Sequence, residues 1–282
     1  MKPIKLLQLL VREHGMARTL QRTPESEQMN DAAQVAAFHE AGEKYLVGLY
    51  HFNAMAIAAM VPEGGRVVDL GSGSAQFIAH LAQVRPDLKI VGIELAERMV
   101  LQGRQLLAQK GLSERVEIWQ GDMTDFSRLM REPVSLVSSV FSLHHLPALE
   151  HLARCLAEIH CIRRRDGAAV WVFDHARPRS LESARRFPEI FTPEAAPVFN
   201  LDSTQSLMAS WTLEEMSGEF TRAGLAEGQH LRSRILPLYQ VHRLPPAAAG
   251  AVADAAGLVS PLPLSAQAKK DFDGLRWLFP AL

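Results

Sequence analysis

The sequence predicts a doubly wound α/β fold built on a mostly parallel sheet of seven strands, with a helical cap at its N-terminus. Two observations support this prediction. Short runs rich in Val and Ile alternate with helix-length stretches from residue 66 to 174, and the chain before residue 62 carries apolar residues at helical spacing. Strand–helix alternation implies right-handed crossovers and a sheet that helices cover on both faces.

The hydrophobic pattern of each segment places the expected strands and helices. Five Val- and Ile-rich runs are expected strands, at 66–70, 89–95, 116–120, 134–140 and 168–174. The stretches between them are long enough for helices over 75–85, 96–110 and 147–163. A further helix is expected over 212–225, with a threonine at its start and a glycine near its end, followed by strands around 229–236 and 238–243.

Changes in composition divide the chain into three regions. Residues 1–61 are expected to form the helical cap, in which "TPESE" at 23–27 indicates a capped helix start. Residues 62–244 form the core, with an insertion at about 175–210, where four prolines and mixed polarity interrupt the alternation. Residues 245–282 are expected to be an Ala/Pro-rich linker followed by a short helix.

The charge balance and the apolar stretches exclude several classes of partner. A formal net charge of −1 gives no electrostatic reason to bind nucleic acid or an anionic membrane. The longest apolar stretch, residues 54–61, is too short to cross a bilayer. We therefore expect no nucleic-acid partner and no membrane partner.

The N-terminus and the cysteines indicate a cytoplasmic protein. Residues 1–15 combine lysines with a short apolar stretch but lack a small-residue cleavage site, so we expect a helix and not a signal peptide. Cys155 and Cys161 point in different directions on one expected helix, which predicts two buried free thiols in a reducing compartment.

The stretch "RVVDLGSGSAQF" at 66–77 combines a strand with a turn that contains two glycines. Gly71 permits a sharp turn, and Gly73 lets a ligand approach the main chain. Ligands of open α/β sheets bind at the carboxyl ends of the strands, where this turn lies. A tight turn without a ligand is an equally good interpretation of a bare G-x-G pattern.

Three acidic residues favour a ligand at this edge. Asp69, Glu94 and Asp122 each stand at or near the end of a successive expected strand, so their carboxylates should lie close together. Such a cluster is costly unless hydroxyl groups or a positive charge satisfy it. A ligand with ribose hydroxyls and a positive centre fits this edge better than a pyrophosphate does.

Four motifs resemble those of the class I S-adenosylmethionine-dependent methyltransferases of the small-molecule type. They are "VVDLGSGSA", "VGIELAERM", "QGDMTDF" and "SSVFSLHHLP", in the order and spacing of that family over about residues 60–240. The resemblance implies a Rossmann-like seven-stranded sheet whose last strand is antiparallel. It also implies that S-adenosylmethionine is the cofactor and S-adenosylhomocysteine its product.

The resemblance also assigns roles to individual residues. The turn of Gly71, Ser72 and Gly73, with Asp69 before it, would lie along the amino-acid end of the cofactor. Glu94, followed by Leu95, would take the ribose hydroxyls. The remaining assignments are Asp122 on the adenine amino group, Met123 on the adenine ring, Ser139 and Val140 beside the methionine, and Tyr50 on the cofactor carboxylate.

The sequence departs from the family pattern at two positions. Ala75 replaces a common third glycine, at an expected small cost, and Ser135 stands where the fourth strand usually begins with an acid. A nicotinamide-dependent oxidoreductase is a weaker alternative, because its G-x-G-x-x-G pattern needs Gly or Ala at the sixth position, where this chain has Gln76.

The candidate catalytic residues are His144 and His145, which follow the fourth strand. Histidine titrates near working pH, so the pair could act as a base or orient the acceptor. A structural role before Pro147 is the alternative interpretation. No metal is expected, because these histidines show no recognisable ligand spacing.

Four further residues are predicted to contact the methyl acceptor: Asn53, Asp174, His175 and Trp211. Loop hydrogen bonding is the alternative for Asp174 and His175. Residues 199–211, which include Asp202, Ser203 and Ser206, could border the acceptor pocket or form a polar loop over the sheet.

The expected function is methyl transfer to a small molecule. No Asn/Asp-Pro-Pro-Tyr/Phe tetrapeptide follows the fourth strand, which disfavours an amino-group DNA methyltransferase. The helical cap and the insertion favour an enclosed pocket. A non-catalytic cofactor-binding protein stays open as an alternative, and so does a homodimer, because the leucines of the first helix could pack on a partner.

Overall fold

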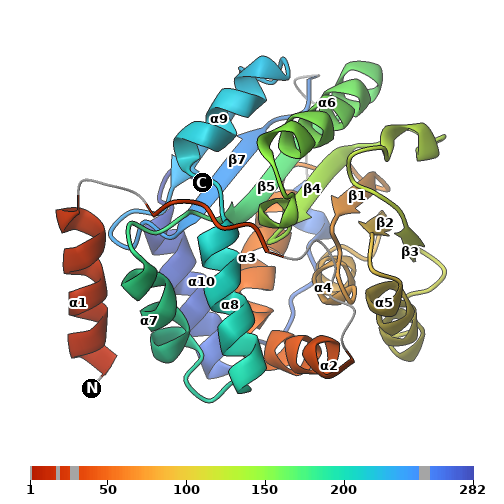
Figure 1. Ribbon diagram of the computed structural model, residues 1–282. Coiled ribbons are helices and arrows are strands. Elements are labelled where there is room, and N and C mark those ends of the chain that lie inside the picture. Colours follow the sequence, from red (N-terminus) through yellow and green to blue (C-terminus); the bar gives the residue numbers. More distant parts are fainter. Residues whose placement is uncertain (1, 17–19, 26–31, 248–254) are drawn as a thin grey trace.

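The computed structural model describes residues 2–16, 20–25, 32–247 and 255–282. Among these residues, seven strands form one sheet in the order β3-β2-β1-β4-β5-β7-β6 (Figure 1). The strands are β1 (Arg66–Leu70), β2 (Lys89–Glu94), β3 (Val116–Gln120), β4 (Leu136–Val140), β5 (Ala169–His175), β6 (Gln229–Arg232) and β7 (Tyr239–Leu244). Strands β1 to β5 pair in parallel, and β7 runs antiparallel to β5 and β6. The predicted fold class is confirmed.

Helices cover both faces of this sheet. One face packs against α3 (Val47–Ala58), α4 (Gln76–Val84), α5 (Glu97–Gln109) and α10 (Ala266–Leu278), and the other against α6 (Leu149–Asp166) and α9 (Leu213–Arg222). Neighbouring residues of β1 show the division: Val67 belongs to the first core and Val68 to the second. Side chains alternate between faces along a strand, so a continuous apolar run fills both cores.

Local sequence sets the ends of several helices. A capping box begins α9, in which Thr212 and Glu215 satisfy each other's backbone N–H groups. Gly167 ends α6 in the left-handed conformation, with φ 71°. These ends agree with the sequence prediction to within a few residues, because the caps are encoded locally.

Helices from the N-terminal region and from residues 175–210 pack beside one another. They are α1 (Lys2–Gly15), α2 (Ala32–Ala41), a π-helix (Gly42–Leu46), α7 (Leu181–Phe191) and α8 (Pro197–Ala209). Helix α8 packs against α7 and α2, and α1 packs against α7. Residues 175–210 therefore contain two helices, and the predicted division into cap, core and tail stays a prediction.

Three sequence expectations need correction. Cys155 is buried but Cys161 is exposed, because they lie on different faces of α6. The strand expected over 229–236 ends at Arg232. The helix start expected at "TPESE" falls partly on residues outside the described ranges, and Thr23, Pro24 and Glu25 are not helical.

Two further observations bear on partners. Leu9 of α1 is buried in the chain's own core, whereas Ile4, Leu7 and Val11 are exposed along the same helix. The predicted homodimer stays a prediction. A bilayer-spanning helix is absent from the part of the chain that the structure describes.

Candidate active site

The turn after β1 brings the main chain to the edge of a cavity. Gly71 has φ 68°, and a Cβ built there would lie 2.4 Å from Cβ of Ser142. Gly73 has φ 55°, and a Cβ there would meet only Phe38, at 4.0 Å. Glycine is therefore required at the first position by conformation and by packing. At the second position its missing side chain leaves room for a ligand.

The carboxylate of Glu94 is fixed by this turn. Its Oε2 accepts a hydrogen bond from the backbone N–H of Gly73 at 2.9 Å, and its Oε1 accepts one from Ala96 at 2.8 Å. Burial raises the pKa of Glu94, while these backbone hydrogen bonds lower it in part. Each oxygen keeps a second lone pair for the hydroxyls of a ribose.

Two other strand-end acids lie at the same edge. Asp122 follows β3 and lines the cavity with Met123, and its Oδ1 accepts from the N–H of Thr124 at 2.7 Å. Asp69 is buried and accepts a hydrogen bond from Ser138 at 2.6 Å. Burial raises the pKa of Asp69 to about 8, which the Ser138 hydrogen bond opposes and Glu94 reinforces.

One cavity of about 350 Å³ contains most of the predicted site residues. Those that line it are Asp69, Gly71, Ser72, Gly73, Glu94, Leu95, Asp122, Met123, Val140, Tyr50, His144, His145 and His175. The cavity continues beyond them to α7, α8 and α10, which contribute Phe187, Phe191, Phe199, Asp202, Ser203, Ser206 and Lys270. Within the segment 199–211, the residues that border the pocket lie on α8, which ends at Ala209.

The far wall of the cavity is aromatic. Phe141 takes φ 57°, a rare conformation for a bulky residue, and its ring lies 4.7 Å from the ring of His175. His175 also stacks on Tyr239, with ring centroids 5.4 Å apart. Burial lowers the pKa of His175 to about 3, so its ring is neutral and serves as part of this wall.

Four predicted site residues do not line the cavity: Ser139, Asn53, Trp211 and Asp174. Ser139 forms a hydrogen bond with the hydroxyl of Ser142 at 2.5 Å. Asn53 accepts from the indole N–H of Trp171 at 2.8 Å and so fixes α3 against β5. These two side chains do not line the cavity, and their contacts with ligands stay predictions.

Trp211 and Asp174 contact the 143–145 segment outside the cavity. The indole N–H of Trp211 donates to the carbonyl of Leu143 at 2.9 Å. Asp174 is buried, and its Oδ1 lies 2.6 Å from Nδ1 of His144. It also accepts from the backbone N–H groups of His144 and His175. Asp174 thus holds the ring of His144 in place, and its contact with the acceptor stays a prediction.

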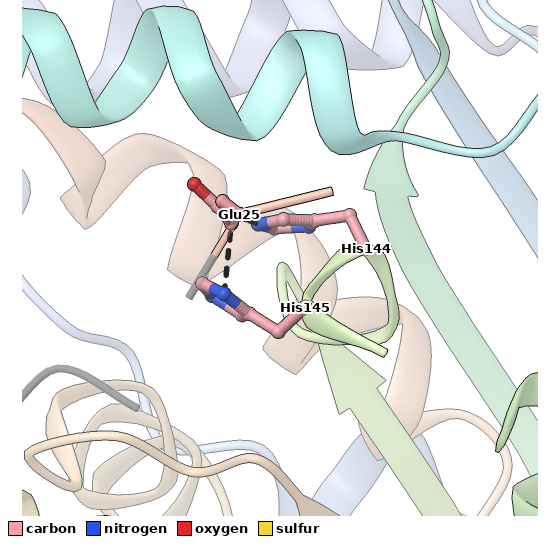
Figure 2. A group of neighbouring side chains, drawn as sticks. All are labelled: Glu25, His144 and His145. Carbon is pink, nitrogen blue, oxygen red and sulfur yellow. Dashed lines mark ion pairs between the residues drawn. The ribbon is translucent and has the colours of Figure 1, made fainter. Parts of the chain in front are cut away.

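Glu25 approaches the histidine pair from the N-terminal segment (Figure 2). Its Oε1 lies 3.4 Å from Nε2 of His144 and 3.1 Å from Nδ1 of His145. Burial raises the pKa of Glu25 to about 7; the nearby His144 lowers it, and Asp202 raises it further. Burial alone would lower the pKa of His144, but Asp174, Glu25 and Asp202 outweigh it and the pKa is raised.

Arg22 holds the segment that carries Glu25. Its guanidinium donates to the carbonyl oxygens of Ala209, Pro147, His144 and Leu146, at 2.6, 2.7, 3.0 and 2.6 Å. It also stacks on Trp211, 3.5 Å from the ring centroid. Residues 20–25 are thus fixed across the loop that bears the histidines.

The cofactor half of the cavity fits S-adenosylmethionine. It offers fixed carboxylates for hydroxyl and amino groups and open space above Gly73. Lys270, on α10, is the only Lys or Arg among the described residues that line the cavity. A pyrophosphate would therefore find acids and almost no balancing charge, which disfavours a dinucleotide.

The family match agrees with this geometry. A family model described as "Methyltransferase domain" matches residues 67–167. Residues 67–167 thus form a methyltransferase domain, and the sheet order agrees with the fold of the class I S-adenosylmethionine-dependent methyltransferases.

Individual relatives cover different shares of the chain. The ribosomal RNA small subunit methyltransferase G of Frankia alni is 37% identical over 73 residues, which are 26% of this chain and 28% of that protein. The same enzyme of Mycobacterium leprae is 36% identical over 90 residues, 30% of this chain and 36% of that protein. The matched part of the chain thus spans only about a third of the length of these curated relatives.

Solved structures resemble the whole fold. The plantazolicin methyltransferase BpumL, in complex with SAH, aligns with a TM-score of 0.57 at 11% identity, over 87% of this chain and 99% of that one. A SAM dependent methyltransferase from Aquifex aeolicus gives a TM-score of 0.52 at 16% identity, over 76% and 98%. At these identities the likeness shows the fold.

Sequence reasoning missed Glu25 and most of the aromatic wall. No local pattern marks a glutamate that becomes buried by distant segments. Phe187 and Phe191 stand four residues apart on α7, so their helical spacing was a detectable signal of a shared face. Tyr239 opens β7, and nothing near it in sequence indicates that it faces a cavity.

Proposed function

We propose that this chain transfers the methyl group of S-adenosylmethionine to a small aromatic acceptor. The observation that carries the proposal is that one continuous cavity runs from Glu94 and Asp122 to the aromatic wall around Phe141 and Tyr239. A flat ring packed on that wall would lie in the same enclosed space as the cofactor. Pockets of this volume and apolar lining are typical of small-molecule sites.

The protein's main contribution would be alignment. S-adenosylmethionine, when bound, supplies a methyl group on a good leaving group, so holding the acceptor in line can contribute about 7–11 kcal/mol. The turn at Gly73 and the carboxylate of Glu94 would fix one partner. The aromatic wall would fix the other and exclude water.

His144 and His145 would activate the acceptor. Asp174, which only accepts hydrogen bonds when ionised, holds the proton of His144 on Nδ1. The neutral ring therefore carries its lone pair on Nε2. That lone pair is available to accept a proton from a hydroxyl or amino group at this end of the cavity.

Ribosomal RNA is the second candidate acceptor, because two curated relatives are named for it. Their matches cover less than a third of this chain. The net charge of −1 gives no general attraction for RNA, and a nucleotide in a folded RNA would have to leave its stack to enter the cavity.

A labelled-methyl assay with matched variants tests the proposal. We expect transfer to members of a panel of small phenols and aromatic amines, and none to small-subunit ribosomal RNA. Ser203→Trp, which fills the acceptor end, should abolish transfer but keep S-adenosylhomocysteine binding. Gln205→Trp, exposed on the same helix, is the control and should retain both.

Each other result has a distinct meaning. Transfer to the RNA, or equal activity of Ser203→Trp and the unchanged chain, would contradict a small-molecule acceptor. Cofactor binding with no transfer to either kind of acceptor would favour the non-catalytic alternative.

A further inference from the structure

The contact between His144 and Glu25 is unfavourable unless a cation or a proton lies there. With its proton held on Nδ1 by Asp174, His144 presents a lone pair on Nε2. That atom lies 3.4 Å from Oε1 of Glu25, which as a carboxylate oxygen is also an acceptor. Two buried acceptors at this distance repel each other.

A third donor atom converges on the same point. Nδ1 of His145 lies 3.1 Å from Oε1 of Glu25, and the three atoms from Glu25, His144 and His145 all lie within 4.8 Å of one another (Figure 2). Metal–ligand bonds of about 2.0–2.1 Å in a tetrahedron separate neighbouring ligands by roughly 3.4 Å. The Glu25 contacts therefore have the spacing that a small divalent ion requires.

The surrounding charge also favours a cation. The carboxylates of Glu25 and Asp174 are both buried, and they lie 3.4 and 2.6 Å from the two ring nitrogens of His144. The guanidinium of Arg22 is the nearby positive charge that acts on Glu25 and Asp174. A divalent ion between Glu25 and His144 would add positive charge beside these buried carboxylates.

We propose that Glu25, His144 and His145 bind a divalent transition-metal ion, with Zn²⁺ as the best match to two imidazoles and a carboxylate. Asp174 would support His144 from behind, as carboxylates commonly do for metal-bound histidines. His144 and His145 both line the cavity, so the remaining coordination position would face the acceptor. This proposal departs from the sequence analysis, which predicts no metal at these histidines.

The site has a clear use in the reaction. A metal at this position would act as a Lewis acid on the hydroxyl or amino group of the acceptor and lower its pKa. This use rests on the proposed function, whereas metal binding itself does not. The test therefore measures binding and needs no turnover.

The experiment uses the full chain, without an affinity tag, stripped with a chelator and titrated with Zn²⁺ and Co²⁺. We expect one ion per chain by calorimetry and elemental analysis, and the visible absorption of tetrahedral Co²⁺. Glu25→Gln and His145→Ala should each weaken binding by about 100-fold or more, and Asp174→Asn by about 10–100-fold. His151→Ala, another histidine of the same cavity, should bind like the unchanged chain.

Folding is checked by the thermal shift with S-adenosylhomocysteine, which every variant should keep. If that shift is present and neither metal binds stoichiometrically, the site holds protons only and the proposal is overturned. Equal affinity of Glu25→Gln, His145→Ala and the unchanged chain would also overturn it. Either result leaves the proposed methyl transfer standing, because the cofactor shift is read separately.

Discussion

The carboxylate of Glu94 accepts a hydrogen bond from the backbone N–H of Gly73, at 2.9 Å. This contact joins the end of β2 to the turn after β1, so the acid and the glycine turn form one unit. The carboxylate is oriented before any ligand arrives, which reduces the entropy that binding must overcome.

Replacing Glu94 should remove cofactor binding. At a hundredfold excess over Kd, S-adenosylhomocysteine should stabilise the unchanged chain by about 2.7 kcal/mol. Glu94→Ala should abolish that shift, because it loses both the ribose contact and the anchor for Gly73. Glu97→Ala, exposed on the first turn of α5, serves as the control in calorimetry. An unchanged shift in the Glu94 variant would contradict the assignment.

Asp69 should make the ligand-free protein less stable as pH rises. Its pKa is raised by burial from 3.8 to about 8, so the fold favours the protonated form. That contribution is full below about pH 4 and is lost as pH rises through about 8. Asparagine cannot ionise, so Asp69→Asn does not lose stability in this way. The free energy of unfolding of this variant, relative to that of the unchanged chain, should therefore rise with pH by at most about 1.4 kcal/mol per pH unit between pH 4 and 8.

Urea unfolding at pH 5, 7 and 9 measures this difference. Asp125→Asn is the control, because the pKa of exposed Asp125 is lowered by Arg128 and its difference should be constant above pH 5. A flat profile for the Asp69 variant would show that this carboxyl is ionised across the whole range.

Arg22 should be irreplaceable by lysine. The planar guanidinium donates to four carbonyl oxygens and stacks on Trp211, and an ammonium group cannot match that geometry. The lysine ammonium has three N–H donors for four carbonyl oxygens. Arg22→Lys therefore leaves at least one carbonyl without a donor and loses the stacking on Trp211, which should together cost about 3 kcal/mol of unfolding free energy.

Chemical denaturation and hydrogen exchange report this effect. Exchange should accelerate in the 143–147 loop that Arg22 holds. Arg131→Lys, on an exposed loop, should stay within about 0.5 kcal/mol of the unchanged chain. Equal stability of the two variants would mean that the segment 20–25 is held by other contacts.

The cofactor half of the site could be predicted because it is encoded locally. Asp69, Glu94 and Asp122 follow recognisable strands, and the ends of parallel strands meet at one edge of a sheet. Val140 lines the cavity and Ser139 does not, because adjacent residues at a strand end point to opposite sides.

The sequence by itself determined the sheet, its caps and the acids at its edge, since each depends on spacing along a short stretch of chain. Only the tertiary structure decided that Glu25 meets His144, that Asp174 lies behind that ring, and that α7, α8 and β7 complete the cavity. Those contacts join segments far apart in sequence. Their formation depends on how whole helices pack, which no local pattern records.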